Sequence, residues 1–278
     1  MACMCPPRTK NNLNRGIYNS CNTYFSNVYR RIIDKDNKIE ENINNWHKHL
    51  NSFGLGNYLG YDHPVGQPGY VPNANFYNLW YPNQRWRGST IVSNAIGQGE
   101  ILMTPIQLAN VAATIANRGF FYTPHFVKGI QGDFIDPKYK TKRVTSISKE
   151  HFTNVIEGMA DVVSKGTARV AGIRGIEVCG KTGTIENFTK IDGDRTQLTD
   201  HSVFIAFAPK DNPKIALAVI VENGYWGARW AAPIASLVIE KYLKGEVKRR
   251  WLENRMLNGS LEEEYAKVTS NKPFAINE

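Results

Sequence analysis

The sequence predicts an α+β fold in which an antiparallel sheet packs against helices. Three observations support this prediction: helical apolar spacing recurs up to about residue 164, strand-like apolar runs follow, and one last helical stretch comes after them. This order is typical of an α+β domain and differs from the alternating strands and helices of a parallel sheet. The length of 278 residues suits one large domain or two small ones.

Two helices and a long loop are predicted in the first third of the chain. Residues 17–33 carry apolar side chains at near-helical spacing, and an Asn or Ser before Thr23 is expected to cap this helix. Residues 39–50 form a second, more polar helical stretch. Residues 60–89 are rich in Pro, Gly, Asn and aromatic residues and show no period, which indicates a long loop that is functional or crosses the surface.

The strongest helix signal in the chain is Thr104-Pro105-Ile106-Gln107. A hydroxyl at the N-cap, a proline at N1 and a glutamine at N3 make a capping box. The helix that follows is predicted to stop at Gly119, which suits a left-handed C′ position. A further amphipathic helix is expected over residues 149–164, with Gly166 after its end.

Three strands and a helix are predicted in the last third of the chain. The strands are expected at residues 176–184, 201–208 and 214–222. The turn sequence 209–213 joins the last two, which predicts an antiparallel hairpin, and the polar stretch 186–200 is expected to be a loop. A helix over 233–243 is expected to end at Gly245. Its predicted packing face consists of Ile234, Leu237, Val238 and Leu243.

The net charge is +9, from 34 basic and 25 acidic residues. A basic chain of this kind raises the question of whether it binds an anionic partner. Part of the charge is clustered near Trp251, at Lys241, Lys244, Lys248, Arg249, Arg250 and Arg255. Because no nucleic-acid-binding motif accompanies the cluster, we interpret it as a solvated helix end and expect no nucleic acid partner. The sequence contains no apolar run of about 18 residues and no signal peptide core.

No metal or cofactor site is predicted. The N-terminal Cys-x-Cys pair lacks zinc spacing and a second pair, and Cys21 and Cys179 are expected to be small buried apolar residues. The His47-x-His49 pair is interpreted as part of a solvated helix face.

Residues 175–182, GIEVCGKT, match the P-loop pattern G-x-x-x-x-G-K-[ST] literally. In a P-loop a strand precedes the first glycine and a helix begins at the lysine. Here the apolar strand residues lie between the two glycines, and a polar segment without a helical stripe follows Thr184. The context therefore argues against nucleotide binding.

The alternative is that Lys181-Thr182-Gly183 is the K-T-G element of penicillin-recognising enzymes. Lys181 supplies a cation for a substrate carboxylate, and Thr182 and Thr184 offer hydroxyls to the same group. Gly183 has no Cβ, so a peptide can lie alongside as an added strand. The Thr184 N–H is then placed to stabilise the oxyanion of acyl transfer.

A second element of the same signature is Ser20-Cys21-Asn22, far upstream in a helical segment. The Ser20 hydroxyl can relay a proton, and the Asn22 amide can hold a lysine and a substrate carbonyl. By itself the tripeptide is better explained by an ordinary helix start, in which Ser20 or Asn22 caps the helix.

Four stretches together resemble class B penicillin-binding proteins: YNSCNTYF, SNAIGQGEILMTPIQLANVAATIANRG, CGKTGT, and DHSVFIAFAP followed by IALAVIVENG. The resemblance runs from about Ser20 to Leu243 and is closest to the elongation-specific D,D-transpeptidases of the penicillin-binding protein 2 type. It implies the β-lactamase-like fold of a penicillin-binding protein transpeptidase domain.

The resemblance also implies an activity and a site. A serine acyltransferase of this family attacks the D-Ala-D-Ala end of a peptidoglycan stem peptide, and β-lactams acylate the same serine. The matching positions imply Ser20, Asn22 and Lys181 as catalytic residues. The substrate-binding positions are Lys181, Thr182, Gly183 and Thr184. The resemblance implies no cofactor, cell-wall elongation proteins as partners, and a location on the periplasmic face of the inner membrane.

The chain departs from the family at S-x-x-K, whose serine is the nucleophile and whose lysine is its base. Nothing in residues 1–19 matches, and the literal match Ser146-Ile147-Ser148-Lys149 precedes a predicted helix, where Ser148 is interpreted as an N-cap. We therefore expect an N-terminally truncated transpeptidase domain over residues 1–250, a charged tail over 251–278, and an inactive fragment.

Two other functions remain open at this point. A chain that kept the fold and lost catalysis would be a peptide-binding or regulatory module; an in-frame S-x-x-K upstream of Met1 would favour the enzyme instead. A P-loop nucleotide binder is the third hypothesis, and nucleotide titration tests it.

Overall fold

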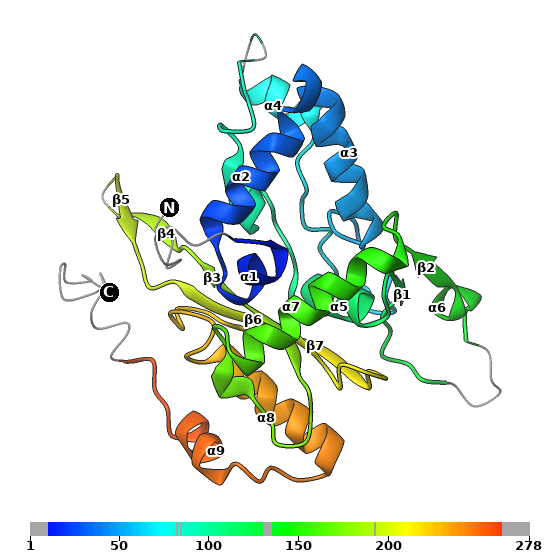
Figure 1. Cartoon of the computed structure of the whole chain (residues 1–278), viewed down its shortest axis with the longest axis vertical. Helices are drawn as coiled ribbons and strands as arrows, with labels where there is room; N and C mark the ends of the chain where they lie inside the picture. Colours follow the sequence, from blue (N-terminus) through cyan, green and yellow to red (C-terminus); the bar gives the residue numbers. More distant parts are fainter. Residues whose placement is uncertain (1–10, 82, 84, 130–134, 192, 263–278) are drawn as a thin grey trace. The chain divides into compact units, whose positions relative to one another are not determined.

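The computed structural model describes residues 11–81, 83, 85–129, 135–191 and 193–262 (Figure 1). The chain divides into two units, Met1–Gly158 and Met159–Glu278. Helices accompany antiparallel sheets, as the α+β prediction requires. Within the described ranges, no helix combines the length and the apolar character that a membrane span needs.

The first unit consists mainly of helices and contains an apolar core cluster. Its α-helices are α1 (Leu13–Tyr18), α2 (Asn22–Ile33), α3 (Ile39–Ser52), α4 (Ala74–Trp80), α5 (Pro105–Ala116) and α6 (Pro137–Lys140), and α7 (Phe152–Ser164) crosses the boundary between the units. The described residues also include the short 3-10 helices η1 (Lys35–Asn37), η3 (Val92–Ile96) and η4 (Lys149–His151). A small antiparallel sheet pairs β1 (Phe120–Tyr122) with β2 (Lys142–Val144). The cluster consists of Tyr29, Ile33, Ile43, Ala74, Tyr77, Trp86 and Ile91.

The helix predicted over residues 17–33 is interrupted at Ser20, whose φ of 50° is left-handed. α1 ends there because the backbone N–H groups of Ser20 and Cys21 donate to carbonyls of its last turns, at 3.1 and 2.9 Å. Cys21 is the N-cap of α2 and makes no side-chain cap bond, so the predicted Asn or Ser cap is wrong. Cys21 is 1% exposed, so its predicted burial is confirmed.

The long loop predicted over residues 60–89 is only partly a loop. Asn73 caps α4 inside it by accepting a hydrogen bond from the Phe76 N–H at 3.1 Å. Trp86 is 2% exposed, and its indole N–H donates to Asn78 at 2.9 Å. The aromatic residues of this stretch therefore contribute to the core of the first unit, which the absence of periodicity did not reveal.

The capping box of α5 is confirmed. The Thr104 hydroxyl accepts from the Gln107 N–H at 3.3 Å, and the Gln107 side chain accepts from the Thr104 N–H at 2.9 Å. The predicted C′ position is wrong by one residue, because Arg118 with a φ of 60° occupies the left-handed site before Gly119.

The second unit contains an antiparallel sheet in the order β3-β6-β7, with α8 packed against β6 and β7 (Figure 1). The strands are β3 (Cys179–Ile185), β6 (His201–Ala208) and β7 (Ile215–Val221), which confirms the predicted hairpin. The stretch predicted as a polar loop contains a second hairpin, β4 (Phe188–Ile191) and β5 (Asp194–Gln197). The remaining elements are η5 (Arg169–Ala171), α8 (Ala231–Lys244) and α9 (Arg250–Leu257).

α8 ends at Gly245, as predicted, but it packs through a different face. The buried residues include Ala232, Ala235, Ser236 and Ile239, whereas Val238 of the predicted face is 47% exposed. Small side chains let a helix approach a sheet closely, so in α8 the small residues mark the contact better than the large apolar ones.

The predicted solvated basic cluster is wrong for Arg249. Its Nε donates to the Glu240 carboxylate at 2.9 Å, and the Glu240 side chain is 2% exposed. Its other nitrogens donate to the carbonyls of Ser236 and Gly172, at 3.0 and 3.1 Å. Arg249 therefore ties the segment after α8 into the unit. The predicted boundary between a transpeptidase domain over residues 1–250 and a charged tail over residues 251–278 stays a prediction. Residues 263–278 of this tail lie outside the described residues.

Candidate functional site

Four of the predicted site residues follow one another on β3: Lys181, Thr182, Gly183 and Thr184. Within the described sheet β3 is an edge strand whose neighbour is β6. Edge strands in general present backbone groups to which another extended chain can add. The sequence motif and the topology therefore agree on a place where a peptide can bind.

The Lys181 ammonium group is hydrogen-bonded to its own strand, where Nζ donates to the Thr182 carbonyl at 2.8 Å. Burial lowers the pKa of Lys181 from 10.5 to about 8. Lys181 as a whole residue is half-buried. Its pKa depends on the surroundings of the ammonium group alone, and that group is buried. Lys181 is therefore mostly protonated at pH 7 and loses its charge as the pH rises past about 8.

Thr167 is a site residue that the sequence analysis missed. Its hydroxyl lies 2.8 Å from the Thr182 hydroxyl, and either group can donate. Thr167 lies between α7 and η5, far from β3 in the sequence. The only nearby sequence signal was Gly166, which marked a helix end and gave no link to Thr182.

The loop over residues 223–230, between β7 and α8, packs on β3. A Cβ on Gly227 would lie 2.4 Å from the carbonyl oxygen of Val203, 2.9 Å from that of Gly183, and 3.0 Å from the Cβ of Thr182. Such separations are too short for a side chain, so glycine is needed where the 223–230 loop touches the strand.

The first two residues of β6 bind the 223–230 loop by hydrogen bonds. His201 Nδ1 accepts from the Asn223 N–H at 3.0 Å. The Ser202 hydroxyl donates to the Trp226 carbonyl at 3.0 Å. His201 is the first residue of β6, which confirms the predicted start of the second strand.

Ser20 and Asn22 lie together in the first unit, at the junction of α1 and α2. Ser20 occupies the left-handed position that ends α1, and Asn22 is the first residue of α2. A left-handed non-glycine residue is uncommon and often accompanies a functional constraint. The proximity of these two residues to Lys181, which belongs to the second unit, stays a prediction.

The literal P-loop match and the literal S-x-x-K match both fit their local structure poorly. Lys181 lies inside a strand that continues to Ile185, whereas a P-loop lysine begins a helix. Ser146 of the literal S-x-x-K match is hydrogen-bonded to His49 Nδ1 at 2.7 Å and lies 3.0 Å from the Ser52 hydroxyl. Ser148 stands at the N-cap position of η4, as interpreted, although its side chain makes no cap bond.

In the part of the chain that the structure describes, no three His, Cys, Asp or Glu side chains are grouped to hold a metal ion. His47 is half-buried, its Nδ1 lying 3.3 Å from the Pro72 carbonyl oxygen. The predicted solvated face is therefore wrong for His47, while His49 is exposed.

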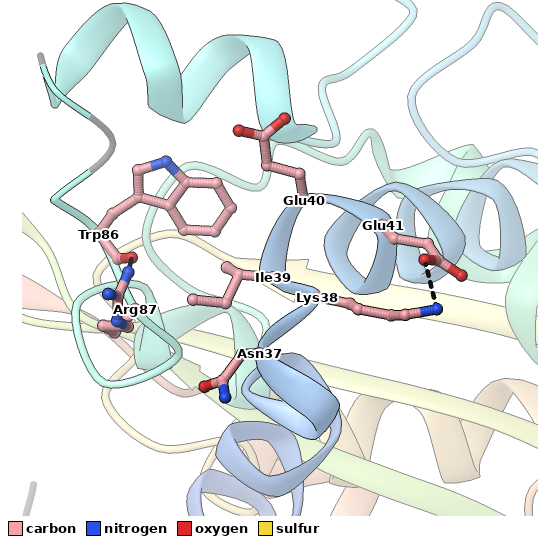
Figure 2. Close-up of a pocket in the computed structure, with 7 residues that line it drawn as sticks. All are labelled: Asn37, Lys38, Ile39, Glu40, Glu41, Trp86 and Arg87. Carbon is pink, nitrogen blue, oxygen red and sulfur yellow. Dashed lines mark hydrogen bonds and ion pairs between the residues drawn. The ribbon is translucent and has the colours of Figure 1, made fainter.

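A pocket of about 360 Å³ opens in the first unit beside Trp86 (Figure 2). It is lined by Asn37, Lys38, Ile39, Glu40, Glu41, Trp86 and Arg87. Its charged side chains have partners: Lys38 pairs with Glu41 at 3.3 Å, and Glu40 accepts from the Asn78 amide at 3.2 Å. None of the predicted site residues lines this pocket.

A comparison with known families identifies the family of this chain. Residues 6–240 match the family described as Penicillin binding protein transpeptidase domain. The chain belongs to this family. The K-T-G interpretation of β3 and the predicted class B resemblance are thereby supported by most of the sequence.

Relatives of known name and structure agree with the family assignment. Peptidoglycan D,D-transpeptidase MrdA of Acinetobacter baumannii is 33% identical over 90% of this chain. Penicillin-binding protein PBP2 of Pseudomonas aeruginosa, solved in complex with WCK 5153, has a TM-score of 0.70 and 30% identity, covering 87% of this chain and 52% of that one. PBP2 of Helicobacter pylori, solved with MreC, has a TM-score of 0.64 and 27% identity, covering 84% and 40%.

These similarities confirm the predicted transpeptidase fold and the resemblance to penicillin-binding protein 2. The chain spans 37% of the length of the Acinetobacter protein. The activity of the whole protein is therefore stated below as a proposal.

Proposed function

We propose that this chain binds the carboxylate end of a peptidoglycan stem peptide as part of a D,D-transpeptidase of the penicillin-binding protein 2 type. The observation that supports this most directly is Lys181-Thr182-Gly183-Thr184 on an edge strand, in a chain of the transpeptidase family. The relative from Acinetobacter baumannii carries the activity in its name.

The proposed chemistry assigns one task to each residue of β3. The Lys181 ammonium attracts the terminal carboxylate of the peptide, and the hydroxyls of Thr182 and Thr184 donate to it. Gly183 lets the peptide backbone lie close to the strand. The Thr184 N–H stabilises the oxyanion that forms when the peptide carbonyl is attacked.

Ser20 and Asn22 are proposed as the proton relay and the amide that hold the reacting groups in place. The serine that becomes acylated belongs to S-x-x-K, which residues 1–19 do not contain. The second candidate is a non-catalytic module that would bind the peptide through the motif of β3 without acyl transfer.

The proposed partners are stem peptides, β-lactams and cell-wall elongation proteins. The family name refers to penicillin binding, and PBP2 of Helicobacter pylori was solved with MreC. We propose that nucleic acid is not among the partners of this chain. The location proposed from the family is the periplasmic face of the inner membrane.

The test of the proposal is the affinity of the chain for a fluorescent peptide ending in D-Ala-D-Ala. Replacing Lys181 with methionine is expected to weaken binding at least about tenfold, because the carboxylate loses its cation. Lys190→Met is the matched control, since Lys190 is an exposed lysine on β4. Equal affinity for the wild type and the Lys181 variant would refute the assignment.

The same assay has an expected pH dependence. The lowered pKa of Lys181 means that the ammonium loses its proton near pH 8 rather than near 10.5, while the peptide carboxylate stays ionised. Affinity is therefore expected to be high at pH 7 and to fall as the pH passes about 8. The Lys181→Met variant is expected to show no such fall.

The polypeptide of these 278 residues, assayed by itself, is not expected to be labelled by a fluorescent penicillin. Acylation needs an activated nucleophile, and binding residues cannot replace one. Labelling is followed on a denaturing gel, with a catalytically active penicillin-binding protein as the positive control. A stable adduct at any serine of this chain would contradict the expectation.

A further inference from the structure

Two aromatic side chains of the 223–230 loop are exposed beside β3. Tyr225 is 36% exposed and Trp226 is 48% exposed. Their ring centroids lie 5.1 Å apart in an edge-to-face arrangement. Large aromatic side chains at the surface are favoured where they contact a ligand or partner.

A cation accompanies this aromatic pair. The Arg229 guanidinium carbon lies 5.5 Å from the ring centroids of both Tyr225 and Trp226. Apart from the Tyr225 hydroxyl, Arg229 is the only ionisable side chain of residues 223–230. A guanidinium over aromatic faces keeps its planar donors oriented, and those donors suit a carboxylate.

The position of this group relative to β3 is fixed by the backbone of the loop. Gly227 contacts the strand at Thr182 and Gly183, and Trp226 is hydrogen-bonded to Ser202 through its carbonyl. Extended residues advance about 3.3 Å each. The proposed function places the attacked carbonyl, which belongs to the penultimate residue of the peptide, at the Thr184 N–H, so the residue before it lies at the level of Ile185. His201 pairs with Ile185 in the sheet and accepts from the Asn223 N–H, so the 223–230 loop lies at the same level.

We propose that Tyr225, Trp226 and Arg229 form a specificity subsite for a second carboxylate of the bound peptide, carried by a residue just upstream of its D-Ala-D-Ala end. The aromatic rings contact the apolar part of that residue, and the Arg229 guanidinium binds its carboxylate. This inference rests on the proposed function, because it assumes that the peptide lies along β3.

The test uses two fluorescent pentapeptides that end in D-Ala-D-Ala and differ at one group. One carries a free side-chain carboxylate at its third residue, and the other carries the carboxamide there. The wild-type chain is expected to bind the acid peptide about tenfold more tightly, the ratio expected for a charge-assisted contact. Arg229→Gln is expected to bring that ratio close to one while leaving the affinity for the amide peptide unchanged.

Arg195→Gln is the matched control. The Arg195 guanidinium carbon also lies over an aromatic ring, 3.9 Å from the centroid of Phe188, but on the β4–β5 hairpin. This variant removes the same charge and is expected to keep the preference for the acid peptide. Trp226→Ala is expected to reduce the affinity for both peptides and also the preference between them.

The outcomes separate the subsite from the proposed function. Equal affinity of the wild type for the two peptides, or an equal loss of both with Arg229→Gln, overturns the subsite alone, provided that Lys181→Met still weakens binding. If neither peptide binds, or if Lys181→Met has no effect on either, the proposed function fails and the subsite fails with it.

Discussion

Arg249→Met is expected to lower the free energy of unfolding by about 3–5 kcal/mol, the cost of leaving one member of a buried ion pair without its partner. The Glu240 carboxylate is 2% exposed and accepts from Arg249 Nε at 2.9 Å. The variant also removes donors from the carbonyls of Ser236 and Gly172. Urea denaturation followed by circular dichroism measures the change.

Two further variants show whether the buried charge is the cause. Arg250→Met removes the next arginine, which pairs with Glu253 at 2.6 Å at the surface, and is expected to leave stability close to that of the wild type. The double variant Arg249→Met with Glu240→Met removes both buried charges and is expected to recover most of the loss. A loss equal in the single and double variants would point to packing instead of charge.

Gly227→Ala is expected to cost about 1–3 kcal/mol of stability, because the added methyl group overlaps the backbone of two strands. The nearest atom is the carbonyl oxygen of Val203 at 2.4 Å, and backbone cannot rotate out of the way. The 223–230 loop must then lift from β3, so affinity for a D-Ala-D-Ala peptide is expected to fall as well. Thermal denaturation and the peptide assay measure the two effects.

Gly129→Ala is the matched control for this prediction. A Cβ at Gly129 meets nothing within 4 Å, and its φ is not left-handed. This variant is expected to melt and to bind peptide as the wild type does. An unchanged melting temperature for Gly227→Ala would show that the loop does not need its close approach to β3.

Elements with a strong local signal were predicted well. Residues 201–208 were expected as a strand and form β6 within the same bounds, because the central strand of the sheet is apolar along most of its length. The start of α5 was predicted from its capping box, which depends on four neighbouring residues alone.

Other elements depend on contacts that local patterns do not carry. Ser20 ends α1 in a left-handed conformation without being glycine, so the break within 17–33 had no signal. The β4–β5 hairpin is mostly exposed and lacks the apolar run by which a strand is usually identified. The buried face of α8 was misjudged because its small residues, such as Ala235, make the contact.

The residues of the candidate site also fall into those that a local motif predicted and those that only the fold reveals. Lys181 and its neighbours were found because a short motif specifies both chemistry and position on a strand. Thr167 was missed because its contact with Thr182 joins two segments that no motif connects. The 223–230 loop was missed because its glycines and aromatics gain meaning only from the strand that they touch.

Within the 223–230 loop, Gly224 and Gly227 are buried and the two residues between them are exposed. The anchoring points and the outward-facing positions are thus separate along the chain. If the proposed subsite is correct, exchanging Tyr225 and Trp226 for other residues changes which peptide is preferred, while the close contact of Gly227 with β3 stays in place.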